Sequence, residues 1–390
     1  MQREIYLDNS ATTRISEEAL EKYIEISREC YGNPSSLHKM GFNAERVLSE
    51  ARDTVRRSLN AKNAQIVFCA SGSEANNLAI FGRAFAKERF AKGARIITTE
   101  GEHASVSEPL EKLGQMGFEI VKIPTRGGVL DLDALKSALT KSTVLVTMMM
   151  VNNETGALYD TAAVARIIKA TAPDALLHID ATQSYLKLPF TLASCGADMI
   201  TLSSHKIEGP KGVGALAISP EVIKARGIVP VTLGGGQEGG FRSGTENVPA
   251  IAAFGKAVEL GLSTLRERFT YVMGLREYAI KKLTEDSVCS EISLTLPERA
   301  APHILNVTLP KIKSETMLHH LSSFGIYVSS GSACSSNGAH VSSALVAFGR
   351  SAREADCSLR ISLSHRNTRE DIDALTEALA AGITRLSRIR

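Results

Sequence analysis

A lysine and an aspartate, each at the end of an apolar stretch, are the first residues that could do chemistry. Lys206 follows one stretch in SSHKIEGPKG, and Asp180 comes near the end of another in ALLHIDATQ. A carboxylate placed after mostly apolar residues is costly to bury without a cationic partner. Before Lys206 come Ser203, Ser204 and His205, whose donors suit an anion. Alone, Lys206 is typical of a solvated loop and Asp180 of a helix N-cap, so only the combination indicates a site.

A lysine, a buried carboxylate and an anion cradle are the groups that pyridoxal phosphate requires. The lysine forms a Schiff base, the carboxylate pairs with the pyridine nitrogen, and helix N-terminal N–H groups with hydroxyls hold the phosphate. The turn SGSEANN, with Gly72 and Ser73, leads into a helical pattern and could hold that phosphate, although many strand–turn–helix joints look similar. His103, in EHAS, could stack on the ring; a single histidine is more often an ordinary polar contact.

Cys334 stands in a stretch that cannot anchor itself in a core. The segment SSGSACSSNGAH (329–340) has no aliphatic residue larger than alanine, which predicts a mobile surface loop. The six cysteines form no CxxC pair, so a zinc knuckle is not indicated, and Cys69 beside IVF is typical of an inert packing residue. A thiol on a mobile loop could instead carry a reactive group between two places.

Apolar runs alternate with amphipathic helical patterns from about residue 60 onward, which predicts an α/β fold with a mostly parallel central sheet covered on both faces. We expect strands within the runs 65–70, 94–100, 143–156, 175–183, 197–206 and 212–218. Polar residues come at or just after the carboxyl ends of these strands, namely Ser73, His103, Asn153, Asp180 and Lys206. Ligands bind at that edge of open α/β sheets, so we expect these side chains to form one site.

The pattern changes near residue 260, which indicates a second domain. A long helical stretch (250–283) leads to the short apolar runs HILNVTLP, GIYVSSGSACSS and LRISLS. A chain of 390 residues also suits about two domains. We therefore expect a large coenzyme-binding domain over 15–258, and a smaller α+β domain, made of 1–14 and 259–390, that carries the cysteine segment.

The composition is that of a soluble globular protein, with 44% hydrophobic residues and a formal net charge of +3. This near balance of charge gives no support to a nucleic-acid or membrane partner. No uninterrupted apolar run reaches the ~18 residues of a membrane span, and the start MQREIYLDNSATT does not read as a secretory signal. We therefore expect a cytoplasmic protein.

Read in order, the motifs resemble those of the cysteine desulfurases of the nitrogen-fixation and iron–sulfur-assembly type. These are fold-type I, class-V aminotransferase-like pyridoxal-phosphate enzymes, and the long cysteine loop resembles their group I. The matching stretches run from YLDNSATT (6–13) through NNETG (152–156) and HIDATQ (178–183) to LRISLS (359–364), so they cover essentially the whole chain. The most specific are GGGQEGGFRSGTEN (234–247) and SSGSACSS (329–336).

The resemblance implies a role for each matching residue. Lys206 would form the Schiff base and act as the base, Asp180 would pair with the pyridine nitrogen, and Gln183 would donate to the ring 3-oxygen. His103 would stack over the ring and could take part in proton transfer. The residues implied for the phosphate are Gly72, Ser73, Ser203 and His205.

Three further roles follow from the same resemblance. Thr245 would reach the phosphate in the neighbouring subunit, which implies a homodimer. Asn153 and Arg360 would bind the carboxylate of L-cysteine; alone, Arg360 is more typical of a surface arginine. Cys334 would take the substrate sulfur as a persulfide while alanine leaves, and pass it on for iron–sulfur cluster assembly or tRNA thiolation. We also hypothesise that Cys334 could bind transiently to an iron–sulfur cluster on a scaffold partner.

Other functions remain open from the sequence. An aminotransferase or a selenocysteine lyase would use the same coenzyme, but transamination needs no thiol such as Cys334. A sulfur-delivery scaffold without catalysis would not need the coenzyme-binding groups, and a thiol oxidoreductase would need a second cysteine close to Cys334. Glu208, where His or Tyr is common, and Gly239, where Arg is common, depart from the family pattern. Because Glu208 is close in sequence to the expected phosphate site, we expect it to affect coenzyme affinity.

Overall fold

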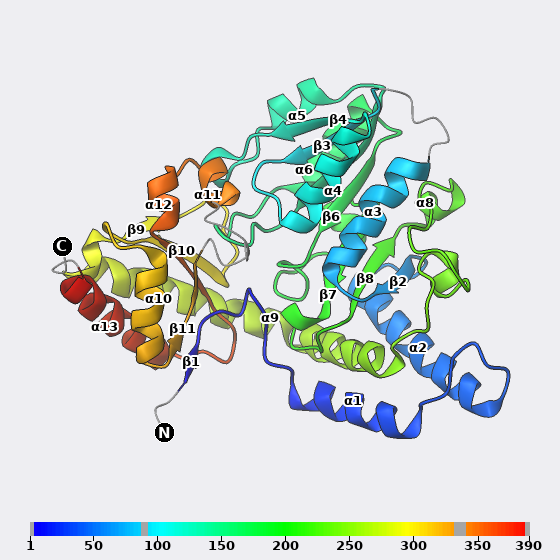
Figure 1. Cartoon of the computed structure of the whole chain (residues 1–390), viewed down its shortest axis with the longest axis horizontal. Helices are drawn as coiled ribbons and strands as arrows, with labels where there is room; N and C mark the ends of the chain where they lie inside the picture. The colour runs from blue at the N-terminus through cyan, green and yellow to red at the C-terminus, as the bar shows by residue number, and fades with distance from the viewer. Residues whose placement is uncertain (1–3, 87–92, 331–340, 387–390) are drawn as a thin grey trace.

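The structure is a computed structural model that describes residues 4–86, 93–330 and 341–386. Cys334, the cysteine singled out in the sequence, lies outside the described residues. Figure 1 shows two parts of unequal size that lie side by side and are joined by helix α9 (Val248–Glu285).

A seven-stranded sheet forms the centre of the larger part (Figure 1). Its strand pairs are parallel except those of β8, which runs against both neighbours. In spatial order the strands are β2 (Gln65–Cys69), β8 (Gly214–Ile218), β7 (Met199–Ser203), β6 (Leu176–Asp180), β5 (Thr143–Met149), β3 (Arg95–Thr99) and β4 (Glu119–Ile123). Each predicted apolar run contains one of these strands, which confirms the α/β prediction. The sequence prediction lacks β4, an edge strand with mostly unburied side chains.

Helices cover both faces of this sheet. Buried side chains of α3 and α4 pack on one face, and those of α2, α6 and the first half of α9 pack on the other. The helices of this part are α1 (Glu17–Glu29), α2 (Lys39–Ser58), α3 (Gly72–Ala86), α4 (Ala104–Gln115), α5 (Leu132–Ala138), α6 (Thr161–Thr171), α7 (Leu192–Cys195) and α8 (Pro220–Lys224). Several start at a polar side chain that accepts a first-turn N–H, as Asp160 does from Ala163.

The smaller part is built on a four-stranded antiparallel sheet. Its strands, in spatial order, are β12 (Ser329–Ser330), β13 (Ser358–Ser362), β10 (Ile304–Thr308) and β9 (Ser293–Thr295). Near it the N-terminal strand β1 (Ile5–Tyr6) pairs in parallel with β11 (Ile326–Tyr327). The helices are α10 (Ser314–Ser323), α11 (Ser343–Phe348), α12 (Ala352–Asp356) and α13 (Arg369–Leu386).

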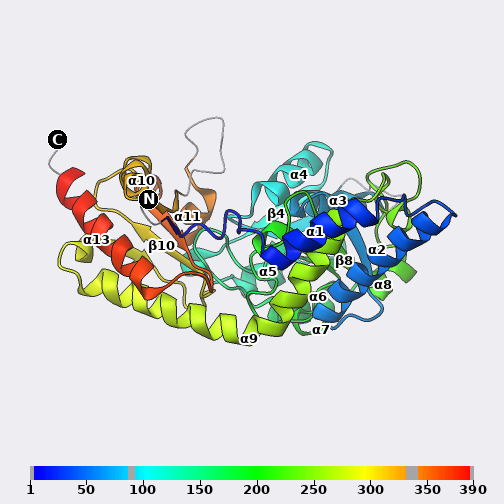
Figure 2. The same cartoon turned by 90° about the horizontal axis from the view of Figure 1, so that it is seen from below.

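Helix α9 belongs to both parts, and Figure 2 shows it running along the underside of the molecule. Its first half, to Val258, packs in the core of the large sheet, and its second half, from Val272, packs with β10, β13 and α13. Ile5 and Leu7 join that second core. The domain boundary at residue 258 stays a prediction; along α9 the change from one core to the other falls between Val258 and Val272.

Among the described residues, α9 is the one helix that is long and apolar enough to cross a membrane. Of its most apolar window, 56% is buried inside the protein. A buried core helix passes the same test of length and composition, so this hydropathy is explained by the two cores that α9 helps to form.

Candidate active site

A cavity of about 500 Å³ opens at the carboxyl edge of the large sheet, where it faces the smaller part. Most side chains singled out in the sequence line it: Gly72, Ser73, His103, Asn153, Asp180, Gln183, Ser203, His205, Lys206 and Arg360. The five strand-end residues of the sequence analysis, Ser73, His103, Asn153, Asp180 and Lys206, therefore line one cavity, and their roles in binding stay predictions. Thr245 instead lines a separate cavity beside Glu238 and Arg242, and Cys334 lies outside the described residues.

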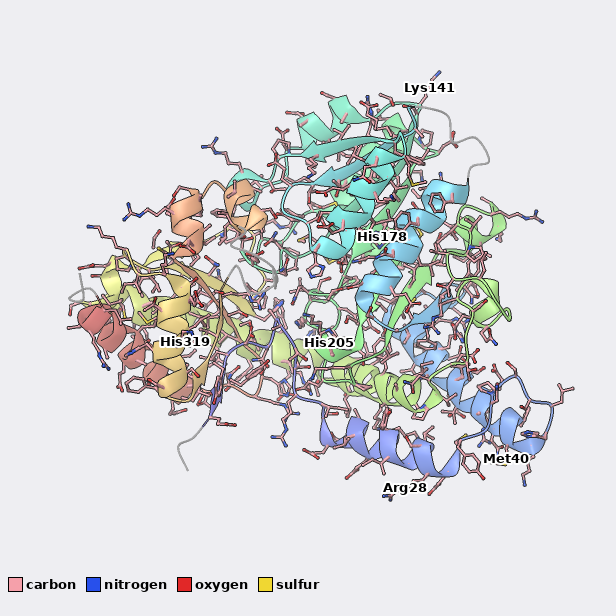
Figure 3. All side chains as sticks on the ribbon, in the orientation of Figure 1. Arg28, Met40, Lys141, His178, His205 and His319 are labelled. Carbon is pink, nitrogen blue, oxygen red and sulfur yellow. The ribbon has the colours of Figure 1, made fainter. Side chains whose placement is uncertain are left out.

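Lys206 enters the cavity from a short 3-10 turn, Ser204–Lys206, that follows β7. Its Nζ donates hydrogen bonds to the carbonyl oxygens of Ser10 and Ala11, both at 2.7 Å. His205, labelled in Figure 3 near the middle of the molecule, contacts the same N-terminal segment through Thr12, at 3.1 Å. The N-terminal segment thus forms one wall of the site, which the sequence pattern did not predict.

Asp180 ends β6 with its side chain buried. Its Oδ2 accepts a hydrogen bond from Asn76 Nδ2 at 2.8 Å, and its Oδ1 accepts one from the backbone N–H of Thr182 at 2.9 Å. A turn rather than a helix follows, so the N-cap alternative is wrong. Two neutral donors hold the carboxylate in place. Its remaining lone pairs can accept a hydrogen bond from a protonated group in the cavity.

A hydrogen-bond network joins Asp180 to His103. Asn76 also donates to Ser105 Oγ at 2.8 Å, and Ser105 Oγ lies 2.8 Å from Nδ1 of His103. The backbone N–H of Ser105 donates to the same Nδ1 at 3.1 Å, because His103 is the N-cap of α4. A backbone N–H can only donate, so Nδ1 is unprotonated and the neutral ring carries its proton on Nε2. Burial lowers the pKa of His103, and Lys206 lowers it further.

The start of α3 provides an anion cradle. A Cβ added at Gly72 would meet Ser203 Cβ and Thr182 Oγ1, both at 3.2 Å, so the missing side chain keeps this end of the cavity open. The first N–H groups of a helix have no acceptor within it and favour an anion. Burial, together with Lys206 and other cations, lowers the pKa of His205 to about 4, so this ring is neutral at pH 7.

Arg360 lies on β13 and is buried, so the surface alternative is wrong. Its Nη2 pairs with Asp8 Oδ1 at 2.9 Å, and its Nη1 donates to the carbonyl oxygen of Asn153 at 3.0 Å. Its Nε is buried without a partner in the described part of the chain. This cation is held in position with one donor unused, as a site for a carboxylate requires.

Residues on both sides of Cys334 also lie at this cavity. Ser329 and Ser330, the first two residues of the cysteine segment, line the cavity. Ser342, which follows it, donates from Oγ to the carboxylate of Glu154 at 2.6 Å, and Glu154 lines the same cavity. Both points at which the chain leaves and re-enters the described structure are therefore fixed next to the site.

Comparison with known proteins decides the family. Class-V aminotransferases match residues 5–375 of the chain. The protein named cysteine desulfurase IscS from Dictyoglomus turgidum is 37% identical, over 100% of this chain and 97% of that protein. Cysteine desulfurase IscS 1 from Archaeoglobus fulgidus is 38% identical, over 98% and 97%. A solved structure of a NifS-like protein superposes with a TM-score of 0.89 at 34% identity, over 99% and 100%. The chain belongs to the cysteine desulfurases of the class-V aminotransferase family.

The fold is thus the fold-type I arrangement that the sequence predicted. Enzymes of this family use pyridoxal phosphate, and the cavity wall of this cysteine desulfurase fits that group. It offers an amine at Lys206, a buried carboxylate at Asp180 and the open cradle at Gly72. In the described part of the chain, Nε of Arg360 and Oδ1 of Asn76 are buried without partners, as polar atoms that await a ligand would be.

Sequence reasoning missed several residues of this desulfurase site. Asp8 and Ser10 belong to an N-terminal segment that reaches the cavity by tertiary folding alone. Asn76 follows Ser73 by three residues on α3, so helical spacing could have placed it on the same face. Within the described residues no group of three or more His, Cys, Asp and Glu side chains could hold a metal ion. The proposed cluster contact at Cys334 stays a prediction.

Glu208 is the departure from the family pattern that the structure explains. It does not line the coenzyme cavity; its buried carboxylate pairs with Arg268 at 3.1 Å and with Arg366 at 2.7 Å. Its backbone N–H donates to Thr13 at 2.7 Å, and its φ is +65°. Glu208 therefore ties the lysine loop to α9 and to the segment before α13, rather than facing the coenzyme phosphate.

We expect Glu208→Gln to destabilise the protein by about 2 kcal/mol, because two arginines lose their shared carboxylate in a mostly buried place. Urea unfolding followed by circular dichroism measures this loss. Glu259→Gln is the matched control, since Glu259 pairs with Lys256 on an exposed helix face and should change stability by less than about 1 kcal/mol. Equal losses of stability in Glu208→Gln and Glu259→Gln would contradict a stabilising role for the ion pairs of Glu208.

Proposed function

We propose that this chain is a pyridoxal-phosphate-dependent cysteine desulfurase that converts L-cysteine to L-alanine and leaves the sulfur as a persulfide on Cys334. The observation that carries the proposal is the convergence of Lys206, Asp180 and Arg360 on one cavity wall. An amine can bind the coenzyme covalently, and a carboxylate can pair with its ring nitrogen. An arginine with an unused donor can bind the carboxylate of the amino-acid substrate. The names of its relatives agree with this chemistry.

Each end of the coenzyme would have its own partners. Lys206 would bind it covalently, Asp180 would pair with its pyridine nitrogen and Gln183 would donate to its 3-oxygen. Gly72, Ser73, Ser203 and His205 would hold the phosphate. When bound, pyridoxal phosphate supplies an electron sink that makes the α-proton of an amino acid acidic and its sulfur open to attack.

The residues of the chain then supply binding and proton transfer. Arg360 and Asn153 bind the substrate carboxylate, which orients the α-carbon toward Lys206. The Nζ of Lys206 takes the α-proton, and a proton returns to the substrate carbon from which sulfur departs. His103, neutral with its proton on Nε2, would stack over the ring and could donate that proton.

Cys334 completes the reaction as the sulfur acceptor. Its thiolate attacks the sulfur of L-cysteine, so the substrate C–S bond breaks as the S–S bond forms. The carbon takes a proton and leaves as alanine, and the enzyme keeps a persulfide. The support from the structure is that Ser330 and Ser342, on either side of the segment, are fixed at the cavity.

We also propose a homodimer. Thr245 lies away from its own coenzyme cavity, so it could reach a phosphate only in a second copy of the chain. Large apolar side chains are exposed before and within α2 and in the loop before α9, namely Tyr31, Leu37, Phe42 and Leu233. Exposed apolar side chains of this size are typical of protein contacts. Sedimentation of the purified chain tests this; a monomer at micromolar concentration would contradict it.

The acceptors we propose are proteins of iron–sulfur cluster assembly or of tRNA thiolation, in the cytoplasm. Among the described cysteines, Cys30, Cys69, Cys195 and Cys289 are free thiols, as expected in a reducing compartment. Labelled sulfur loaded from L-cysteine and traced in a cell lysate would identify the protein that receives it. Label that goes to no protein would contradict a delivery role.

The function is tested by incubating the coenzyme-loaded chain with L-cysteine and a reductant. We expect alanine and sulfide in equal amounts, because the reductant releases the persulfide sulfur. An aminotransferase would instead consume cysteine without forming alanine, and a scaffold without catalysis would not bind the coenzyme. Either result would contradict the proposal.

Asp180→Asn should lower kcat for alanine formation by about 10²-fold or more, because an amide does not hold the pyridine nitrogen protonated. The amide can still occupy the place of the carboxylate next to Asn76 and Thr182. Steady-state kinetics with saturating coenzyme measure the effect. Asp198→Asn is the control, since Asp198 lies outside the cavity; a comparable loss there would contradict a specific role for Asp180.

A further inference from the structure

Lys187 is a buried cation next to the site that the proposed mechanism does not use. It follows Gln183 by four residues, and its Nζ donates to Gln183 Oε1 at 3.1 Å. Lys187 does not line the coenzyme cavity. It lines a second, smaller cavity of about 70 Å³ behind Lys206, together with His303 and Glu208.

Gln183 has two fixed partners of opposite polarity. Its Nε2 donates to the carbonyl oxygen of Ser10 at 2.9 Å, on the other side of the amide from Lys187. An ammonium can only donate and a carbonyl oxygen can only accept. A flipped amide would place NH₂ against the ammonium and oxygen against the Ser10 oxygen, so it would replace two hydrogen bonds with two repulsions. These two contacts therefore decide the orientation of the amide.

The orientation decides what Gln183 offers to the coenzyme cavity that it lines. One N–H of its NH₂ group is used by Ser10, and the second N–H remains as a donor. The Ser10 carbonyl oxygen also accepts from Lys206 at 2.7 Å, so its two lone pairs are shared by the two donors. The ammonium at Oε1 supplies the second constraint and polarises the amide, which strengthens its N–H as a donor.

We infer that Lys187 is a positioning residue for the coenzyme: it holds the Gln183 amide so that an N–H, and not the carbonyl oxygen, faces the ring 3-oxygen. This inference rests on the proposed function, because it takes Gln183 as the partner of that oxygen. Lys187 acts through Gln183 and touches neither coenzyme nor substrate.

The surroundings make this cation costly to keep. Burial lowers the pKa of Lys187 to about 7, and the cations Lys206 and Arg360 add to the shift, so the ammonium that orients the amide is the main form below that pH. In the described part of the chain no carboxylate lies within 4 Å of its Nζ. The titratable groups that line the second cavity with it are Lys206, Glu208, Arg268, His303 and His365, and Glu208 pairs with arginines. The hydrogen bond to Gln183 is thus the specific polar contact that Lys187 makes among the described residues.

The test follows the pH midpoint at which the absorbance of the bound coenzyme changes. A donor to the 3-oxygen favours its deprotonated form, so loss of that donor raises the midpoint. We expect Lys187→Met, which keeps the length of the side chain without its donor, to raise the midpoint by about one pH unit. Lys187→Arg keeps a cationic donor and should restore a midpoint close to that of the parent.

The variant Gln183→Ala and its combination with Lys187→Met distinguish this positioning role from a direct effect of the Lys187 charge on the coenzyme. If Lys187 acts through Gln183, then Lys187→Met causes no further shift in the Gln183→Ala background. A shift of equal size in both backgrounds, or an unchanged midpoint in Lys187→Met, would overturn the inference. Urea unfolding of the coenzyme-free variants provides the second readout, since a purely structural lysine would lower stability without moving the midpoint.

The proposed function and this inference fail differently. A parent chain that binds pyridoxal phosphate and desulfurates cysteine, with the same midpoint in Lys187→Met, would overturn the inference alone. A parent chain that gives no absorbance with added pyridoxal phosphate would overturn both.

Discussion

Replacing Lys206 with alanine is expected to lower kcat for alanine formation by at least about 10³-fold, because the variant loses both its covalent anchor for the coenzyme and its base. Among the described residues that line the coenzyme cavity, Lys206 is the one lysine. Its Nζ donates to the Ser10 and Ala11 carbonyl oxygens, and these contacts fix its position in the cavity. We therefore expect no other amine of the chain to replace it.

Two measurements follow this variant. Steady-state alanine formation gives the loss in kcat, and gel filtration shows whether pyridoxal phosphate still travels with the protein. Lys211→Ala is the matched control: Lys211 is exposed, lies five residues further along the chain and does not line the cavity. A Lys206→Ala enzyme within tenfold of the parent, or an equal loss in Lys211→Ala, would contradict the assignment.

Replacing Cys334 with alanine should reduce sulfide release from L-cysteine to the background without protein, while coenzyme absorbance stays. Three of the described cysteines make poor substitutes for this thiol. Burial raises the pKa of Cys69, Cys195 and Cys289, the last to about 12, so these thiols are protonated at neutral pH and closed to solvent.

Cys30→Ala controls for the general effect of removing a thiol, because Cys30 is half-buried at the C-terminal end of α1 and does not line the coenzyme cavity. It should release sulfide at the rate of the parent. Desulfuration by Cys334→Ala at that same rate would contradict the persulfide step. It would not affect the assignments of Lys206 and Asp180, which concern the coenzyme.

The strand-end part of the site could be predicted from sequence for a simple physical reason. Asp180 and Lys206 each follow a mostly apolar run, and such runs form the buried strands of a parallel sheet. Since the carboxyl ends of parallel strands share one edge, these residues had to be neighbours. His103, Asn153 and Ser73 followed from the same rule, and all of them line the cavity.

The rest of the site depends on contacts between segments far apart in the chain. Asp8 pairs with Arg360 across 352 positions of sequence, and Ser10 accepts from Lys206 across 196. No periodicity in the N-terminal segment signals these contacts, because that segment is not a regular element of the large sheet. Hydrogen bonds between side chains, such as that of Lys187 with Gln183, are likewise set by tertiary packing.

The surroundings of Glu208 also depend on contacts with distant parts of the chain. In sequence it stands two residues after Lys206, so proximity suggested an effect on the phosphate. A backbone φ of +65° turns its side chain to the second cavity, where Arg268 and Arg366 neutralise it. Neither the left-handed conformation nor the arginines, 60 and 158 residues away, could be predicted from the local pattern.

The central claim is that sulfur from L-cysteine passes to Cys334 through the site formed around Lys206. The most direct test is the mass of the peptide that contains Cys334, measured after brief incubation of the coenzyme-loaded enzyme with L-cysteine and without reductant. We expect one additional sulfur atom on that peptide in the parent and none in Lys206→Ala. Alanine formed with no added sulfur on Cys334, or with the sulfur on another cysteine, would contradict it.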